Sequence, residues 1–194
     1  MNTKRTRTAV LMLFLLVSSS AAAQEPQADE QAAMIAAAAP GDFHAFLAGK
    51  AGSWNVVGKM WGAPGEEPMV SETSAEAQMI LGGRFLYETM QGEIMGQPFE
   101  GLGITGCDNA TGIITSVWYD NSGTATNILT GTCGVPGGPM DLTGTARDPM
   151  TGLDMKVHTR TTFVSEDESL FEYFTSGAGG AEVKVMELHY TRAD

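Results

Sequence analysis

Two side chains near the end of the chain could together hold an anion. Tyr190 and Arg192 are separated by one residue in the stretch "ELHYTRAD", so they share one face of a strand. A guanidinium that donates two hydrogen bonds and a phenol that donates a third suit a buried carboxylate. If this face points into a pocket, the pair predicts binding of a small acidic molecule.

A second group of candidates lies near the middle of the chain, where Arg84 shares a strand face with Glu88. Facing inward, Arg84 would be a second anchor for an anion. Facing outward, it would be an ordinary cation at the start of a strand, and the sequence leaves both open. In an apolar pocket Glu88 would have a raised pKa and could act as a general base, as could Glu172. Arg84 and Glu88 are therefore candidate ligand-binding residues.

Trp118 is the remaining candidate for a pocket and lies on the same strand face as Ile114 and Ser116. A large aromatic residue at such a position fills a core more often than it recognises a ligand, and both roles stay open. Methionines on the predicted inner faces would give soft, adaptable packing, which suits an apolar pocket and also a plain core. They are Met60, Met79, Met90, Met140, Met155 and Met186.

Motifs that would identify an enzyme or a metal site are missing from the sequence. There is no Gly-x-Ser-x-Gly nucleophile motif, no Gly-rich phosphate loop and no zinc-protease helix. The three histidines, His44, His158 and His189, form no pair at the spacing typical of zinc ligands. We expect neither a metal nor a cofactor, and a cryptic enzyme acting on a small hydrophobic substrate is an alternative.

The elements that must position these residues are strands, because apolar residues recur at every second position from Gly52 onward. This alternation, with Asn, Asp, Gly and Pro at the turns, predicts ten strands with short connections. They span residues 53–61, 70–80, 84–91, 98–107, 112–119, 124–132, 139–146, 152–163, 168–176 and 181–192. Such a series indicates an all-β, antiparallel up-and-down β-barrel, since closure exposes fewer strand edges than an open sandwich does.

A short helix precedes the first strand. Asp42 is its predicted N-cap, and Phe43, Phe46 and Leu47 have the spacing of one apolar helical stripe, which ends at Gly49. A helix of this length is not stable alone, so we expect it to lie against the barrel.

The first residues have the pattern of a bacterial export signal. Three cations precede the apolar run 9–17, and small residues follow it up to Ala23, where cleavage is expected. The run is too short to span a bilayer, so we expect no membrane span in the mature protein. We interpret residues 1–23 as a signal peptide and 24–40 as a linker to a domain at 41–194. This places the protein in the periplasm or outside the cell.

Charge excludes one class of partner. Three of the 11 Lys and Arg residues and none of the 23 Asp and Glu residues lie in the predicted signal, which leaves eight cations against 23 acids. A chain this acidic is repelled by nucleic acid, so we expect no nucleic-acid partner. A protein partner for the acidic surface is a further alternative.

Cys107 and Cys133 are the only cysteines of the chain, and in an exported protein they predict a disulfide. Cys107 ends the fourth predicted strand and Cys133 the sixth, and the fifth strand lies between them. The axes of such strands are ~9.6 Å apart, which is more than the ~7 Å limit on the Cα–Cα distance of a disulfide. The bond can form if both residues lie in the loops that leave the sheet. Two buried free thiols are the alternative.

Closure of the barrel would pair the last strand with the first, so Arg192 could reach Trp54. A guanidinium over an indole face contributes roughly 0.5–2 kcal/mol. We weigh this structural role of Arg192 above a role in anion binding. The pairing of Gly52-x-Trp54 with a C-terminal Arg192 resembles the signature of the lipocalins and their wider barrel superfamily.

A closer resemblance rests on three further stretches. They are "LGGRFL" (81–86), "GQPFEGLGITGCDNATGIITSVWYDNSG" (96–123) and the terminal "YTR". They resemble the exported bacterial family catalogued as domain of unknown function 1579 (DUF1579), over most of residues 41–192. The resemblance implies a lipocalin-like barrel without an established activity. Family members more often carry an aromatic residue where Cys107 stands, so the resemblance does not imply the disulfide.

An exported lipocalin-like barrel implies a protein that binds a small, largely apolar molecule, of which a carboxylic acid is one form. The Tyr190 and Arg192 pair is similar to the one with which fatty-acid-binding barrels hold a carboxylate. A haem-binding barrel of the nitrobindin type is the alternative, because that type takes its axial histidine from the region of His189. Against it, the predicted alternation places His189 on the outer face.

Overall fold

The computed structural model describes residues 25–148, 151–176 and 180–193. The predicted export signal, residues 1–23, lies outside them. Within the predicted linker 24–40 the chain forms an Ala-rich helix, α1 (Glu25–Ala38), because Ala has the highest helix propensity. The chain divides into two compact units after Ala36, and the features below belong to the second unit. No helix among the described residues is long and apolar enough to cross a membrane.

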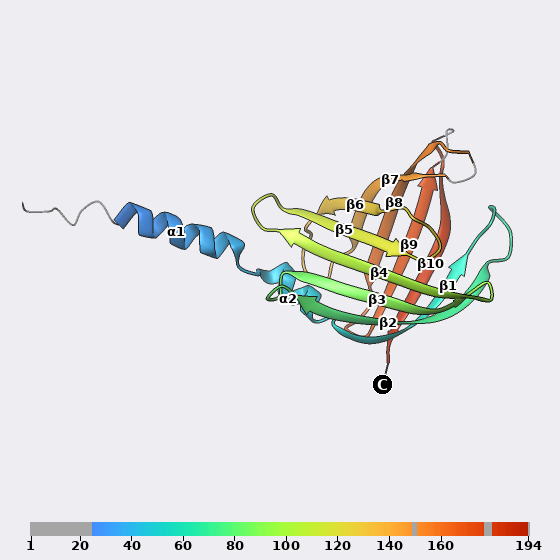
Figure 1. Cartoon of the computed structure of the whole chain (residues 1–194), viewed down its shortest axis with the longest axis horizontal. Coiled ribbons are helices and arrows are strands. Elements are labelled where there is room, and N and C mark those ends of the chain that lie inside the picture. Colours follow the sequence, from blue (N-terminus) through green and yellow to red (C-terminus); the bar gives the residue numbers. More distant parts are fainter. Residues whose placement is uncertain (1–24, 149–150, 177–179, 194) are drawn as a thin grey trace, which may run out of the picture. The chain divides into compact units, whose positions relative to one another are not determined.

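Ten antiparallel strands form a closed barrel, in which successive strands pair and β1 also pairs with β10 (Figure 1). They are β1 (Gly52–Met60), β2 (Met69–Ile80), β3 (Phe85–Ile94), β4 (Gln97–Asp108), β5 (Ile113–Asp120), β6 (Asn127–Thr132), β7 (Met140–Arg147), β8 (Asp154–Phe163), β9 (Glu168–Ser176) and β10 (Glu182–Arg192). The predicted fold class is confirmed, and all predicted strand boundaries lie within three residues of the observed ones. Because side chains alternate along a strand, every second residue faces the interior.

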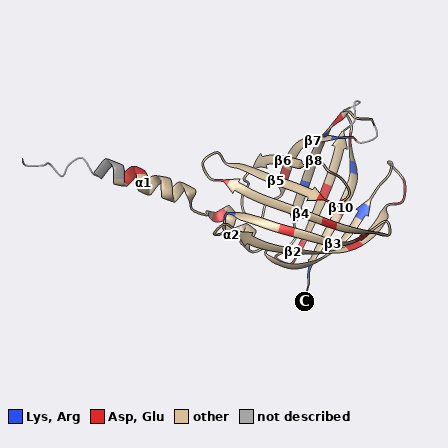
Figure 2. Cartoon of the chain, viewed as in Figure 1, with Lys and Arg blue, Asp and Glu red and all other residues tan. Residues whose placement is uncertain are grey.

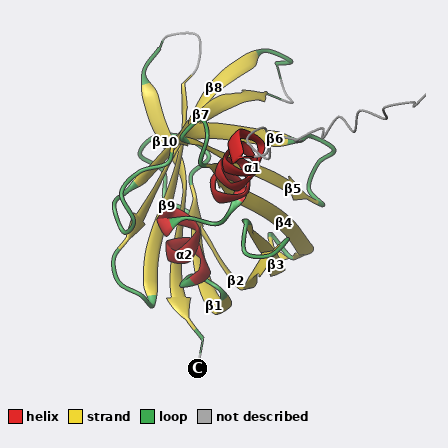
Figure 3. Cartoon of the chain, turned by 90° about the vertical axis from the view of Figure 1, so that its left-hand side faces the viewer, coloured by secondary structure: helices red, strands yellow, loops and turns green. Residues whose placement is uncertain are grey.

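Helix α2 (Asp42–Ala48) lies at the closed end, where β1 begins and β10 finishes, and contacts β2, β3 and β4 (Figure 3). The predicted N-cap is wrong, because the cap is Gly41, whose backbone is extended. The Gly41 N–H donates to Nδ1 of His44 at 3.1 Å, and Asp42 is already helical. A carboxylate in the first helical turn is favoured by the helix dipole, so Asp42 still stabilises this helix.

At the closed end of the barrel, Arg192 links the last strand to the first. In the pairing of β1 with β10, Trp54 lies opposite Arg192, and the guanidinium carbon is 4.4 Å from the centre of the indole ring. Trp54 is 3% exposed, and its Nε1 donates to the carbonyl oxygen of Lys50 at 3.0 Å. The indole is therefore held at its Nε1 by the chain before β1 and across its ring face by the cation of β10.

The same guanidinium also holds the loops of the closed end. It donates to the carbonyl oxygens of Gly49, Ala51 and Glu166 and to Oδ1 of Asp167, at 2.6 to 3.2 Å. Gly52 leaves room for it: a Cβ there would lie 2.7 Å from Nη1 of Arg192, and its φ of +130° is one that L side chains rarely adopt. The Gly-x-Trp stretch and the C-terminal Arg192 thus form one structural unit, the closing tie.

Cys107 and Cys133 form the predicted disulfide, with their Cα atoms 6.0 Å apart. Cys107 lies inside β4, opposite Ile114 of β5, and Cys133 directly follows β6. The expected condition, that both cysteines lie in loops, is not met. Both pack around the fully buried Ile114 on the inner side of the closed end, where curvature brings side chains closer together than the strand axes are. A disulfide is consistent with a protein outside the cytoplasm.

We expect Arg192→Ala to lower the free energy of unfolding by about 2–4 kcal/mol, measured by urea denaturation. The substitution removes the cation–π contact and the hydrogen bonds to the carbonyl oxygens of Gly49 and Ala51. Arg147→Ala is the matched control, because Arg147 also pairs with an aspartate, Asp154, but the two side chains are 70% and 72% exposed. Its loss should stay below about 0.5 kcal/mol. Equal losses in the two variants would contradict the closing role of Arg192.

Replacing both cysteines, in Cys107→Ala/Cys133→Ala, should lower the free energy of unfolding by about 3–4 kcal/mol. The bond closes a loop over a sequence separation of 26 residues, and its removal frees that loop in the unfolded chain. Thermal melts with and without reductant measure the effect. The wild type should melt earlier with reductant and the variant should not respond, whereas a variant as stable as the oxidised wild type would refute the expectation.

Candidate functional site

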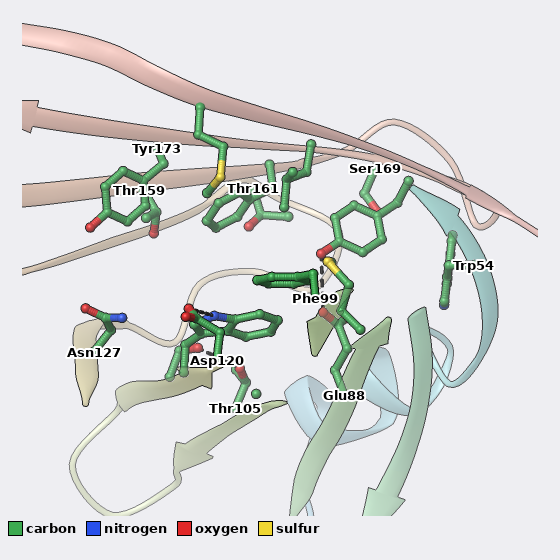
Figure 4. Close-up of a pocket in the computed structure, with 18 of the residues that line it drawn as sticks. Trp54, Glu88, Phe99, Thr105, Asp120, Asn127, Thr159, Thr161, Ser169 and Tyr173 are labelled. Carbon is green, nitrogen blue, oxygen red and sulfur yellow. Dashed lines mark hydrogen bonds between the residues drawn. The ribbon is translucent and has the colours of Figure 1, made fainter. Parts of the chain in front are cut away.

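The interior of the barrel holds a cavity of about 820 Å³ (Figure 4). Inward-facing side chains from all ten strands line it, and most of them are apolar. Among them are Leu86, Met90, Phe99, Phe171 and Leu188. A cavity of this size, with apolar walls and a few polar groups, is typical of a site for a small molecule.

A carboxyl and a phenol meet inside this cavity. Glu88 of β3 and Tyr190 of β10 both line it, and the Tyr190 hydroxyl donates to Oε1 of Glu88 at 3.2 Å. Two other strands, β1 and β2, separate β3 from β10 in the sheet, so the bond crosses the interior. Within the described part of the chain, Tyr190 gives the only hydrogen bond that the Glu88 side chain receives, and Oε2 has no protein donor.

Burial changes the proton affinity of both groups. It raises the pKa of Glu88 to about 7, against the smaller opposite effect of the hydrogen bond from Tyr190. Burial, and then the nearby charge of Glu88, raises the pKa of Tyr190 well above its ordinary value. Tyr190 therefore remains a hydrogen-bond donor, whereas Glu88 exchanges its proton near neutral pH.

Lys50 lines the cavity at the closed end of the barrel, which forms the floor of the cavity. Backbone carbonyl oxygens there already bind its ammonium. Nζ donates to the carbonyl oxygens of Ser165 and Glu166, at 2.8 and 3.1 Å. The same atom lies 5.4 to 6.0 Å from the ring centres of Phe46, Trp54 and Phe163. Burial, followed by the neighbouring charge of Arg192, lowers the pKa of Lys50. Its charge therefore serves mainly to hold the closed end together.

Trp118 forms part of the cavity wall and packs against the strand beside it. A Cβ at Gly103 of β4 would lie 3.0 Å from the indole, and one at Gly101 would overlap it, so the two glycines make room for the ring. Its Nε1 donates to Oδ2 of Asp120 at 3.0 Å. Trp118 thus fills the core on one side and presents a flat aromatic surface to the cavity on the other.

The open end of the cavity, away from the floor, carries polar groups on one side and apolar residues such as Ile94 and Met95 on the other. Its lining there includes Asp120, Asn121, Ser122 and Asn127. Asp120 accepts hydrogen bonds from the backbone N–H of Ser122, at 3.0 Å, and from its hydroxyl. Figure 4 shows Trp54 at one end of the cavity, Asn127 and Tyr173 at the other, and Glu88 and Phe99 between them. A ligand would therefore meet polar groups on one side of the mouth, an apolar middle and a buried carboxyl.

Three of the five residues predicted to bind a ligand line the cavity, namely Glu88, Trp118 and Tyr190. Arg84 does not: it is exposed ahead of β3 and donates to the carbonyl oxygens of Ala38 and Leu81. Arg192 does not either, because its guanidinium is taken up by the closing tie. The predicted anion site of Tyr190 with Arg192 is absent, since the Tyr190 hydroxyl turns to Glu88.

His189 and Glu172 lie away from the cavity. Nε2 of His189 is 2.7 Å from Oε1 of Glu168, and Glu172 accepts a hydrogen bond from Lys184 at 3.0 Å. Neither residue lines the cavity, and no histidine is found among its described lining residues. A haem in this cavity would not reach His189.

Sequence reasoning missed several lining residues. Phe99 and Tyr173 could have been found, because each continues the two-residue alternation of its strand into the interior. Asp120 and Asn127 stand at strand ends, where the alternation no longer tells which way a side chain points. Lys50 precedes β1 and belongs to no periodic segment, so no signal in the sequence marks it.

Comparisons with known proteins bear on the fold. No curated protein matches this sequence. The crystal structure of Rv2717c from M. tuberculosis is similar over 80% of this chain and 100% of that one, with a TM-score of 0.55 and 19% sequence identity. A redesigned β-barrel is similar over 78% of this chain and 95% of its own, with a TM-score of 0.42 and 17% identity. Residues 39–192 match the family described as "Protein of unknown function (DUF1579)", and the chain belongs to that family.

Proposed function

We propose that this protein binds a small, largely apolar molecule inside the barrel. The observation that supports it most directly is the cavity of about 820 Å³, with its apolar walls and few polar groups. A barrel that served only as a scaffold would be more stable with a filled interior, because empty space forfeits packing energy.

The position of Glu88 supports the same conclusion. Burying a carboxyl is unfavourable, and the single hydrogen bond from Tyr190 offsets only part of that cost. The closing tie does not involve Glu88, so the fold gains nothing evident from an acid at this place. A titratable group with a strongly shifted pKa that lines a cavity is typical of a functional site.

Binding is better supported than catalysis. Apart from the Tyr190 hydroxyl, the described residues place no side chain in hydrogen-bond contact with Glu88, so no protein nucleophile is positioned for it to activate. The phenol of Tyr190 orients the carboxyl and, at its raised pKa, does not exchange its own proton. The pair can hold a ligand in one orientation without any chemical step.

An acidic ligand fits this cavity less well than the sequence suggested. Neither Arg84 nor Arg192 lines the cavity, and the ammonium of Lys50 is bound by backbone carbonyl oxygens. The carboxyls of Glu88 and Asp120, which do line it, would repel a carboxylate. The ligand is therefore a neutral or basic molecule.

We also infer that the protein works in the periplasm or outside the cell. The pattern of residues 1–23 supports export, and the bond between Cys107 and Cys133 is consistent with an oxidising compartment.

Nile red, a neutral apolar dye, should bind to the purified protein with increased fluorescence. Thr161→Trp should weaken this binding at least tenfold, because Thr161 lines the cavity and an indole there would fill it. Thr162→Trp is the matched control, since Thr162 is the next residue of β8 and is exposed on the outer face. The affinity of Thr162→Trp for Nile red should stay within twofold of the wild type. Absence of dye binding to the wild type, or equal losses in the two variants, would contradict the proposed function.

Glu88→Gln should stabilise the protein at pH 8 by up to about 3 kcal/mol and change its stability little at pH 4. Because the pKa of Glu88 is raised from 4.5 to about 7 on folding, the folded wild type holds more protons than the unfolded chain between these values. Its free energy of unfolding therefore falls as pH rises from 4.5 to 7, by about 1.36 kcal/mol for each pH unit. Gln carries no charge at any pH and can still accept the hydrogen bond from Tyr190.

Urea denaturation of the wild type and Glu88→Gln at both pH values measures this difference. Glu100→Gln removes the same charge from an exposed position on β4 and should show no comparable gain. A gain that is equal at pH 4 and pH 8 would mean that Glu88 does not titrate near neutrality.

A further inference from the structure

We infer that the ligand is a hydrophobic amine: an apolar body that fills the cavity and a basic nitrogen whose protonated form pairs with Glu88. The inference rests on the proposed function and narrows it to one class of ligand. It starts from Oε2, the second carboxyl oxygen of Glu88. Oε2 receives no hydrogen bond from any described residue, and the Glu88 side chain lines the cavity.

The geometry of the pair leaves a place for a donor. Tyr190 holds Oε1 and so fixes the orientation of the carboxyl, while Oε2 remains available on the cavity side. An ammonium has hydrogen-bond donors and no acceptor, so it complements a carboxylate that has a free acceptor and is held by a phenol. An acceptor group at the same place would face an oxygen lone pair instead.

The charges of the cavity favour a cation. The charged residues among its described lining are Lys50, Glu88 and Asp120. Lys50 is already bound to two carbonyl oxygens and lies against three aromatic rings, whereas Asp120 contributes a second negative charge near the mouth. The low dielectric of apolar walls strengthens these interactions relative to water.

The buried carboxyl gains most from a partner of opposite charge. Without one, burial raises the pKa of Glu88 to about 7, and the ionised form is unfavourable in the apolar interior. A neutral hydroxyl could also donate to Oε2, but it would not stabilise the ionised carboxyl as an ammonium does. An ammonium adds a direct charge–charge attraction to its hydrogen bond with the carboxylate, and a neutral hydroxyl lacks that attraction.

The acidic surface of the protein also favours a cationic ligand. The chain has 23 acidic and 11 basic residues, and Figure 2 shows the acidic ones on several strands and loops of the barrel, with fewer Lys and Arg among them. A net negative field raises the local concentration of small cations and speeds their association.

The test compares three ligands that share one alkyl chain, namely dodecylamine, dodecan-1-ol and dodecanoic acid. Each displaces Nile red from the full-length mature protein at pH 8, where Glu88 is ionised and an alkylamine, with a pKa near ~10, is protonated. We expect dodecylamine to bind at least ten times more tightly than either of the others. Glu88→Gln should weaken dodecylamine at least ten times more than it weakens dodecan-1-ol, and binding of the alcohol that remains shows that the variant is folded with its cavity intact.

Glu100→Gln is the control for the loss of one negative charge, and it should leave the affinity for dodecylamine within twofold of the wild type. Equal affinities for the three ligands, tighter binding of the acid, or an unchanged affinity for dodecylamine in Glu88→Gln would overturn the inference. In these three outcomes the barrel still binds apolar molecules, so the proposed function survives. If neither Nile red nor any of the three ligands binds, the proposed function fails together with the inference.

Discussion

The barrel depends on the contact between the first and the last strand. A sheet of ten strands remains open unless β1 and β10 pair, and Arg192 adds to their backbone hydrogen bonds a cation–π contact with Trp54 and four hydrogen bonds to the closed end. Gly52 is required for this, because any Cβ there would clash with the guanidinium. Closure therefore relies on a glycine and a tryptophan near residue 53 and on an arginine two residues before the end of the chain.

The closed end also explains why the rest of the interior can stay partly empty. Helix α2, the disulfide and the buried Ile114 fill this end, and Lys50 with its two carbonyl acceptors completes its polar part. The buried cluster around Ile114 and the hydrogen bonds of Lys50 and Arg192 thus stabilise one end of the barrel. The remaining length of the barrel can carry a cavity and an unfavourable carboxyl, because stability does not have to come from there.

The fold could be predicted from the sequence because it depends on local signals. The two-residue alternation and the turn residues place all ten strands, and the pairing of Trp54 with Arg192 follows once a closed barrel is assumed. Errors arose where a local pattern has two solutions. Gly41 and Asp42 can each cap a helix, and the Ala-rich segment before them can be a linker or the helix that the structure shows.

The candidate site was predicted only in part, because its chemistry depends on residues that meet across the barrel. The alternation puts Glu88 and Tyr190 on inner faces, but β3 and β10 are not neighbours, so no pairing rule brings the two side chains together. A change at one position, such as Glu88, would alter the charge of the cavity without touching the closing tie. Closure and the chemistry of the cavity are therefore set by different residues of this barrel, and the cavity has to be understood from the side chains that meet inside it.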